Sequence, residues 1–302
     1  MGNDSSATLG TGGIVLTPTT DIALDSEDLY ISPTEIRVRY RFRNLTNTDV
    51  PLRIAFPLPD IDLAELSEVP VERPGSDEIN FVDFKVTADG RAITPELDAR
   101  ALLKDEDVTD YLAAKGVKLS FFVDGFYDSL KALDAAGRRD MTARGLAVYD
   151  DYDNVYPQWT LRTAFHWPQT FPANATVVIE HRYKPVVGQF FVSKYSLEGD
   201  ELARFCVDRG TAVAIDKRIK QHSTTAETEG LLVARNVDYI LKTANNWRGP
   251  IGRFTLTLDK GGADRLLSLC FDGNLKKTGP TTFTAELTNY VPNADLSLLI
   301  LE

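Results

Sequence analysis

The sequence predicts a mainly β protein of the α+β class, built from two antiparallel, immunoglobulin-like β-sandwich parts with helical insertions. Two observations predict this fold. Short runs of alternating apolar and polar residues recur along the chain, and turns rich in Gly, Pro, Asn and Asp separate them. With 302 residues and 43% hydrophobic content, the chain is near the size at which one core usually divides, so it forms either two domains or one domain with an insertion. We therefore expect an N-terminal part of residues 1–187 and a C-terminal part of residues 188–302.

The most regular strand signal lies at Ile36–Arg43, where four apolar residues alternate with four arginines. This period of two predicts one face on the core and one face in solvent. The outer face then carries Arg37, Arg39, Arg41 and Arg43. These arginines are suited to clamping an anion, but on a chain with a net charge of −11 we expect them to pair with neighbouring carboxylates. The turn at Asn44–Asp49 predicts an antiparallel hairpin with a returning strand at Val50–Leu58.

Residues from about 95 to 148 change to helical spacing. Apolar side chains recur at intervals of three and four over Ala99–Lys115, and Gly116 provides a helix end. A second such run covers Tyr127–Ala136. We expect this helical insertion to cap one end of the N-terminal sandwich.

Strands resume at Gln158–Trp167 and Ala175–Tyr183. Each carries a histidine, and the two histidines stand at no motif spacing. We expect His166 and His181 to be packed or half-exposed strand side chains.

The C-terminal part begins with helical spacing over Glu198–Gln221 and continues with short strands and turns. This pattern predicts short helices followed by a second antiparallel sandwich. In Tyr239–Asp259 we expect a strand pair joined by a rigid corner at Trp247-Arg248-Gly249-Pro250. Trp247 is interpreted as a core side chain, with a stacking surface for a ligand as the alternative.

Charge and motifs exclude several classes of function. The chain has 44 Asp and Glu against 33 Lys and Arg and no basic run, which disfavours nucleic acid and anionic membrane surfaces as partners. No apolar run approaches the roughly 18 residues of a membrane-spanning helix. The spaced motifs of zinc peptidases, serine hydrolases and phosphate-binding loops are missing from the sequence, so we expect no catalytic residues.

One stretch, Val148–Trp159, combines acidic and aromatic residues. Its carboxylates are hard oxygen ligands of the kind that Ca²⁺ or a lanthanide binds, and they lie at Asp150, Asp151 and Asp153. The spacing departs from an EF-hand loop at Val155, so an ordinary acidic loop is favoured over a looser cation site. The aromatic residues give another interpretation, a ligand cleft lined by Tyr152, Tyr156 and Trp159.

The two cysteines, Cys206 and Cys270, lie far apart in apolar settings and lack metal-binding spacing. They are either two buried free thiols or one disulfide bridge between the helical segment and the C-terminal sheet. The chain starts without a basic segment or an apolar signal core, which we interpret as a signal peptide removed upstream. An oxidising compartment favours the bridge.

Several motifs make the sequence similar to a known family: Ser26–Pro33, Ile36–Asn44, Ala55–Ile61, Phe171–Ala173 followed by His181–Gly188, and Asn246–Gly252. Over nearly the whole chain they resemble the proteobacterial domain-of-unknown-function family 4424. The resemblance implies an exported, periplasmic protein made with a signal peptide that ends just before Asn3. It also implies a bridge between Cys206 and Cys270. It implies no activity and no catalytic residue, because the family has none assigned.

Together these observations predict a non-enzymatic periplasmic protein that binds a small ligand or an envelope partner at the junction of its two parts. The candidate ligand-binding residues are Tyr152, Tyr156, Trp159, Trp247 and Arg248. The first alternative is a Ca²⁺- or lanthanide-binding protein that uses Asp150, Asp151 and Asp153; no other cofactor is expected. The second and less favoured alternative is a hydrolase of envelope polymers, which requires a triad or a carboxylate pair in a cleft. The sequence sets no oligomeric state.

Overall fold

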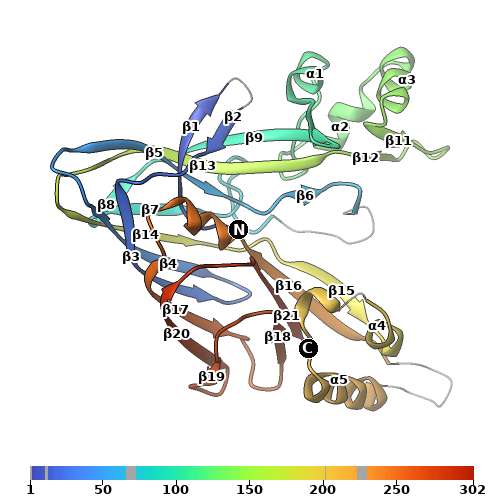
Figure 1. Cartoon of the computed structure of the whole chain (residues 1–302). Helices are drawn as coiled ribbons and strands as arrows, with labels where there is room; N and C mark the ends of the chain where they lie inside the picture. Colours follow the sequence, from blue (N-terminus) through green and yellow to red (C-terminus); the bar gives the residue numbers. More distant parts are fainter. Residues whose placement is uncertain (1, 11–12, 66–72, 201, 223–229) are drawn as a thin grey trace.

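The computed structural model describes residues 2–10, 13–65, 73–200, 202–222 and 230–302. The described residues form layered β-sheets with helices at two ends, so the prediction of a mainly β protein is confirmed (Figure 1). No helix in these ranges is long and apolar enough to cross a membrane.

The central layer is an eight-stranded sheet in the order β19-β20-β17-β3-β4-β14-β7-β8. Its strands are β3 (Ile22–Ile31), β4 (Ile36–Asn44), β7 (Lys85–Ala88), β8 (Arg91–Ile93), β14 (Thr176–Tyr183), β17 (Ile251–Asp259), β19 (Lys276–Lys277) and β20 (Thr282–Tyr290). Burial alternates residue by residue along β4, which confirms the predicted half-exposed strand. This sheet contains strands from both the N-terminal and the C-terminal side of residue 187. The division of the chain into parts 1–187 and 188–302 stays a prediction.

A seven-stranded sheet lies over the inner face of the central sheet, in the order β10-β9-β13-β5-β1-β2 with β6 paired to β13 (Figure 1). Its strands are β1 (Ser5–Gly10), β2 (Gly13–Leu16), β5 (Val50–Pro57), β6 (Ile61–Asp62), β9 (Glu96–Leu103), β10 (Glu106–Asp107) and β13 (Thr160–Phe171). Aromatic rings fill the space between the two sheets. Phe84 stacks on Phe165 at 4.5 Å between ring centroids, and Phe56 stacks on Phe84 at 4.9 Å. Such buried rings supply large apolar areas to one continuous core.

A four-stranded sheet in the order β15-β16-β21-β18 packs beside these layers, with α4 and α5 on its outer side (Figure 1). Its elements are β15 (Gly188–Val192), β16 (Leu232–Tyr239), β18 (Leu266–Leu269), β21 (Leu296–Leu301), α4 (Lys194–Glu198), a 3₁₀ turn (Ala203–Phe205) and α5 (Arg209–His222). At the other end lie α1 (Thr109–Ala114), α2 (Phe126–Lys131), α3 (Ala135–Ala143) and the hairpin of β11 (Ala147–Tyr149) and β12 (Val155–Pro157).

Three local expectations are wrong. β4 and β5 form no hairpin, because the chain crosses between sheets at residues 45–49 and each strand pairs elsewhere. The predicted helix over Ala99–Lys115 is wrong in its first part, where β9 pairs with β13, and holds only at its end, where α1 forms before Gly116. In Tyr239–Asp259, a 3₁₀ turn at Lys242–Asn246 sends β16 and β17 into different sheets. Alternation identifies a strand and its buried face, but not its partner.

The corner after β16 holds the N-terminal segment Gly2–Ser6 inside the molecule. The amide of Asn3 donates to the carbonyl of Ile240 at 2.6 Å, and Trp247 Nε1 donates to the carbonyl of Asp4 at 2.8 Å. A Cβ atom at Gly2 would lie 2.1 Å from the carbonyl oxygen of Pro57, so only glycine fits this approach. Trp247 is 3% exposed and thus takes the core role favoured for it.

Candidate ligand-binding site

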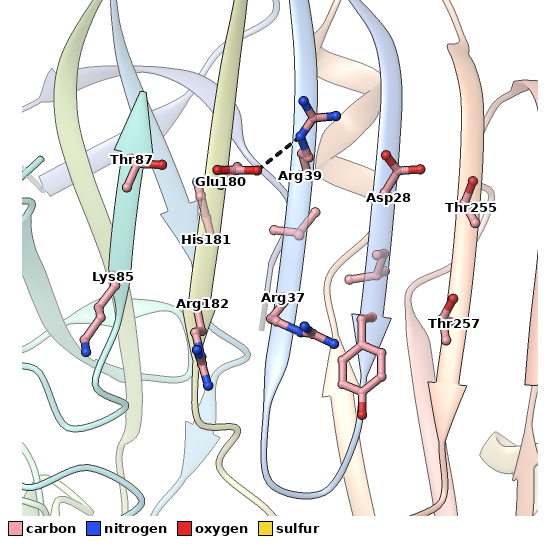
Figure 2. Close-up of a pocket in the computed structure, with 13 residues that line it drawn as sticks. Asp28, Arg37, Arg39, Lys85, Thr87, Glu180, His181, Arg182, Thr255 and Thr257 are labelled. Atoms are coloured by element: carbon pink, nitrogen blue, oxygen red, sulfur yellow. Dashed lines mark hydrogen bonds and ion pairs between the residues drawn. The ribbon is translucent and has the colours of Figure 1, made fainter. Parts of the chain in front are cut away.

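The outer face of the central sheet contains a groove of about 500 Å³. Figure 2 shows that side chains from β7, β14, β4, β3 and β17 point into it from parallel rows across the strands. A volume of this size is typical of sites for small molecules. The groove therefore places a ligand-sized space on a rigid sheet.

One row across the groove is cationic. The register places Lys85 opposite Arg182, and Arg182 opposite Arg37, on three neighbouring strands (Figure 2). Tyr30 follows on β3, and the Arg37 guanidinium lies 4.3 Å from the centroid of its ring. Like charges directly opposite each other destabilise a sheet. The repulsion among these three neighbouring cations therefore destabilises the fold, and a bound anion would reduce it.

Glu35, in the turn between β3 and β4, balances part of this charge. Its carboxylate lies 3.1 Å from Arg37 Nε and also contacts Arg182 Nε. Among the described residues Lys85 forms no ion pair; the carboxylate that its charge acts on, Asp83, is paired with Lys184 at 2.8 Å. The cationic row of Lys85, Arg182 and Arg37 thus retains unbalanced positive charge.

The neighbouring row is electrically balanced. Arg39 pairs with Glu180 at 3.1 Å, and Asp28 pairs with Arg253 at 3.5 Å. Threonines on β7 and β17 complete the lining with hydroxyl groups: Thr87, Thr255 and Thr257. The groove thus combines a cationic row with groups that donate and accept hydrogen bonds.

The inner face of the same strands carries a buried polar cluster. Asp4 lies 3.3 Å from His181 Nε2, the Asn3 amide donates to Glu27 at 2.8 Å, and the hydroxyl groups of Tyr40 and Tyr239 are 3.1 Å apart. Burial raises the pKa of Glu27 to about 8, against a smaller lowering effect of the Asn3 hydrogen bond. Burial likewise raises the pKa of Asp4, although His181 opposes the shift. His181 connects this cluster to the groove, because the residue contributes to the groove's lining while its side chain is fully buried beside Asp4.

The predicted aromatic ligand site is not assembled. Trp159 and Trp247 are buried in different core clusters, where Trp159 Nε1 donates to the carbonyl of Leu119 at 3.0 Å. Tyr152 is 87% exposed at the tip of the β11–β12 hairpin, and the Tyr156 hydroxyl donates to Asp150 at 3.3 Å. Arg248 is exposed and donates to the carbonyl of Thr20 at 3.2 Å. These side chains share no cavity that the structure shows.

The acidic loop uses two of its three carboxylates within the protein. Asp150 accepts hydrogen bonds from the Asn154 side-chain amide at 2.8 Å and from the backbone amides of Asn154 and Tyr152, both at 2.9 Å, and these bonds lower its pKa. Asp153 pairs with Arg138 at 2.5 Å, while Asp151 is exposed. Within the described ranges no three acidic, histidine or cysteine side chains come together as a metal site would require. The cation-binding alternative for Asp150, Asp151 and Asp153 stays a prediction.

The bridge between Cys206 and Cys270 is present, which confirms the disulfide prediction. It ties the segment before α5 to the loop after β18.

The junction of the two predicted parts contains two clefts, and a ligand site there stays a prediction. Two clefts with shared walls, of about 610 and 290 Å³, lie where the seven- and four-stranded sheets meet. Their common lining includes Asp60, Arg204 and Asp238. The Asp60 carboxylate accepts hydrogen bonds from two nitrogens of the Arg162 guanidinium group, Nη2 at 2.6 Å and Nε at 3.1 Å. Its charge is therefore already matched.

Sequence reasoning found only part of the cationic row. Alternation placed Arg37 and Arg39 on an outer face and raised the anion interpretation, but it did not identify Glu35, Lys85 or Arg182. The one signal in the sequence was the alternation of Glu180 and Arg182 with buried residues along β14. Their position beside Arg37 depends on strand pairing over some 140 residues.

The described residues thus form a β-layered protein with a charged groove of ligand size on an open sheet face. The chain belongs to the family named Domain of unknown function (DUF4424), whose model matches residues 2–299. A search of curated proteins found no match.

Solved structures give distant similarities. A Legionella pneumophila protein, provisionally described as a nutrient binding protein, is 17% identical over 99% of this chain and 72% of its own, with a TM-score of 0.49. An M1 zinc metallopeptidase from Deinococcus radiodurans is 7% identical over 94% of this chain and 43% of its own, with a TM-score of 0.28. Leukotriene A4 hydrolase from Saccharomyces cerevisiae is 9% identical over 93% and 29%, with a TM-score of 0.33. The chain spans less than half of each of these two enzymes.

Proposed function

We propose that this chain is a non-enzymatic, exported binding protein of the proteobacterial periplasm, and that its ligand is a small anion held in the groove of the central sheet. The observation that carries the proposal is the cationic row. Lys85, Arg182 and Arg37 stand side by side with one carboxylate between them, on a chain whose net charge is −11. A positive site on an acidic protein selects and concentrates anions locally.

The groups that line the groove are suited to holding a ligand. Guanidinium groups form charge-assisted, two-pronged hydrogen bonds with carboxylates and phosphates. Threonine hydroxyls on β17 orient polar groups of the ligand. This arrangement supports binding, and it supplies no paired nucleophile and base.

Export is supported by the disulfide between Cys206 and Cys270, because such bridges persist in oxidising compartments. Cell fractionation, with intact mass measurement of the recovered protein, tests this part. Recovery of the protein from the cytosol with both thiols reduced would refute it.

The groove is tested by isothermal titration calorimetry with phosphate, sulfate and small carboxylates at low and physiological salt. We expect at least one anion to bind, with an affinity that falls as salt screens the site. The Lys85→Gln/Arg182→Gln variant should lose about tenfold or more in affinity, the value of one charge-assisted contact. An Arg139→Gln/Lys217→Gln variant removes the same charge from exposed positions on α3 and α5 and should bind as the original chain does.

The junction clefts are the other location for a ligand, and the same titrations separate the two. Binding that survives the groove variant but is lost in Arg204→Gln would move the site to the junction. Arg204 lines both clefts and lies far along the chain from the groove residues, so its substitution leaves the cationic row intact.

A further inference from the structure

The two arginines of the cationic row already hold a carboxylate. Glu35 Oε2 lies 3.1 Å from Arg37 Nε, while its Oε1 contacts Arg182 Nε. One carboxylate therefore bridges guanidinium groups on two neighbouring strands. The site shows directly which chemical group it accepts.

The turn that carries Glu35 is fixed by its own hydrogen bonds. The amide of Ser32 donates to the Glu35 carbonyl at 2.9 Å, and the Ser32 hydroxyl accepts from the Glu35 amide at 3.0 Å. The Glu35 side chain is 24% exposed, and it extends from this turn to two more exposed partners, Arg37 and Arg182, which are 53% and 69% exposed. Water reaches the cationic side of these pairs, where surface ion pairs contribute about 0–1 kcal/mol, and the turn keeps its own hydrogen bonds, so a ligand carboxylate can exchange with Glu35 without unfolding the turn.

The charge of the row extends beyond what Glu35 can reach. Lys85 stands one strand further from Arg37 than Arg182 does. Neighbouring strands are about 4.8 Å apart, so the row is about 10 Å long from Lys85 to Arg37. A single small anion matches one part of such a row. Two anionic groups on one short ligand match its whole length.

We propose that the ligand of the groove is a small dicarboxylate, and that Glu35 is a resident competitor that one ligand carboxylate displaces. This inference rests on the proposed anion-binding function and names both its ligand class and the residue that sets its affinity. One carboxylate of the ligand takes the place of Glu35 between Arg37 and Arg182. The second lies beside Lys85, the cation of the row that has no ion-pair carboxylate among the described residues.

The test is calorimetric titration of the original chain and of Glu35→Gln with linear dicarboxylates from malonate to pimelate, with the matching monocarboxylates and with inorganic phosphate. We expect one chain length to bind best, and each dicarboxylate to bind more tightly than its monocarboxylate. Glu35→Gln keeps the size of the side chain and removes the competing charge, so it should bind the preferred dicarboxylate about tenfold more tightly. Glu106→Gln, on β10 of the other sheet, removes the same charge elsewhere and should leave affinity unchanged. Thermal unfolding of each variant checks that it folds, and Glu35→Asp serves as a second variant whose shorter side chain withdraws the carboxylate.

The possible results test three claims separately: the role of Glu35, the ligand class and anion binding itself. Equal or weaker binding by Glu35→Gln and Glu35→Asp would overturn the role of Glu35 as a competitor. Phosphate binding more tightly than every dicarboxylate, or affinity that ignores chain length, would overturn the ligand class while anion binding stands. If no anion binds to the original chain or to Glu35→Gln, the proposed function itself fails.

Discussion

The two faces of β3, β4 and β14 place similar chemical groups in opposite surroundings. On the outer face, Arg39 and Glu180 form an ion pair in which both side chains remain nearly half exposed. On the inner face, Glu27 and His181 are buried, and burial, helped by the nearby charges of Asp4 and Asp28, raises the pKa of Glu27 to about 8, so that its carboxyl group is mostly protonated at neutral pH. One set of strands therefore separates charges that water can exchange from polar groups that water cannot reach.

This difference explains why a ligand site is proposed on one face only. An exposed pair is weak, so a ligand can replace one partner at little cost. A buried polar group that loses its partner leaves an unpaired group in a low dielectric, which is expensive. The outer face is suited to exchange, while the inner face fixes the N-terminal segment between the sheets.

The largest effect should come from breaking the inner cluster at Asp4. Asp4→Ala leaves His181 buried without its carboxylate and removes a side chain from a closed space. We expect the free energy of unfolding to fall by about 3 kcal/mol or more, the usual cost of removing one partner of a buried pair. Urea denaturation monitored by tryptophan fluorescence measures it.

The matched control is Asp28→Ala on the outer face, which removes the same group from a partly exposed pair with Arg253. Asp28→Ala should lower the free energy of unfolding by less than about 1 kcal/mol. Asp4→Asn, which keeps size and hydrogen-bonding capacity, should lie between them. Equal losses at Asp4 and Asp28 would break the contrast between the two faces.

The next effect is a dependence of stability on pH that Glu27 controls. Its pKa rises from an ordinary 4.5 to about 8 on folding, mainly because burial disfavours the charged form. Between these values the folded state holds a proton that the unfolded state has released. The free energy of unfolding should therefore be highest below pH 4.5 with respect to this group and fall by about 1.4 kcal/mol for each pH unit until the folded carboxyl group ionises near pH 8.

Glu27→Gln imitates the protonated acid and should remove its share of this slope. The remaining slope reports other groups, among them Asp4, whose raised pKa acts in the same direction. Glu286→Gln, at an exposed position on β20, should leave the slope unchanged. Denaturation curves collected from pH 5 to above pH 8 decide it, and identical slopes for Glu27→Gln and the original chain would show that Glu27 is charged in the folded state.

A structural feature could be predicted from this sequence when the residues that produce it lie close together along the chain. The alternation over Ile36–Arg43 is local, and both the strand and its outer arginines follow from it. The disulfide follows from two cysteines and an expected oxidising compartment. The positions of Asp4 beside His181 and of Lys85 beside Arg182 need pairings that no local pattern encodes.

The errors have the same physical origin. The start of the predicted helix, Ala99–Leu103, has apolar residues that fit a helix, but it belongs to β9, whose pairing with β13 on one side and β10 on the other satisfies its backbone in a sheet. His181 was expected to be an ordinary strand side chain, and its burial is as expected. The sequence around it carries no sign of the carboxylate that reaches it from the N-terminal segment.

The smallest effect belongs to the outer face. A double-mutant cycle on Arg39→Ala and Glu180→Ala isolates the interaction of these two side chains, which are 45% and 49% exposed. We expect a coupling free energy of about 0.5 kcal/mol that disappears at high salt, because both partners keep their water and the solution screens them. Urea denaturation of the four proteins at low and high salt gives the value. A coupling above about 2 kcal/mol, or one insensitive to salt, would mean that the outer face is as rigidly paired as the inner one. In that case a ligand could not exchange with Glu35 at little cost, since the neighbouring cations would be fixed in place as well.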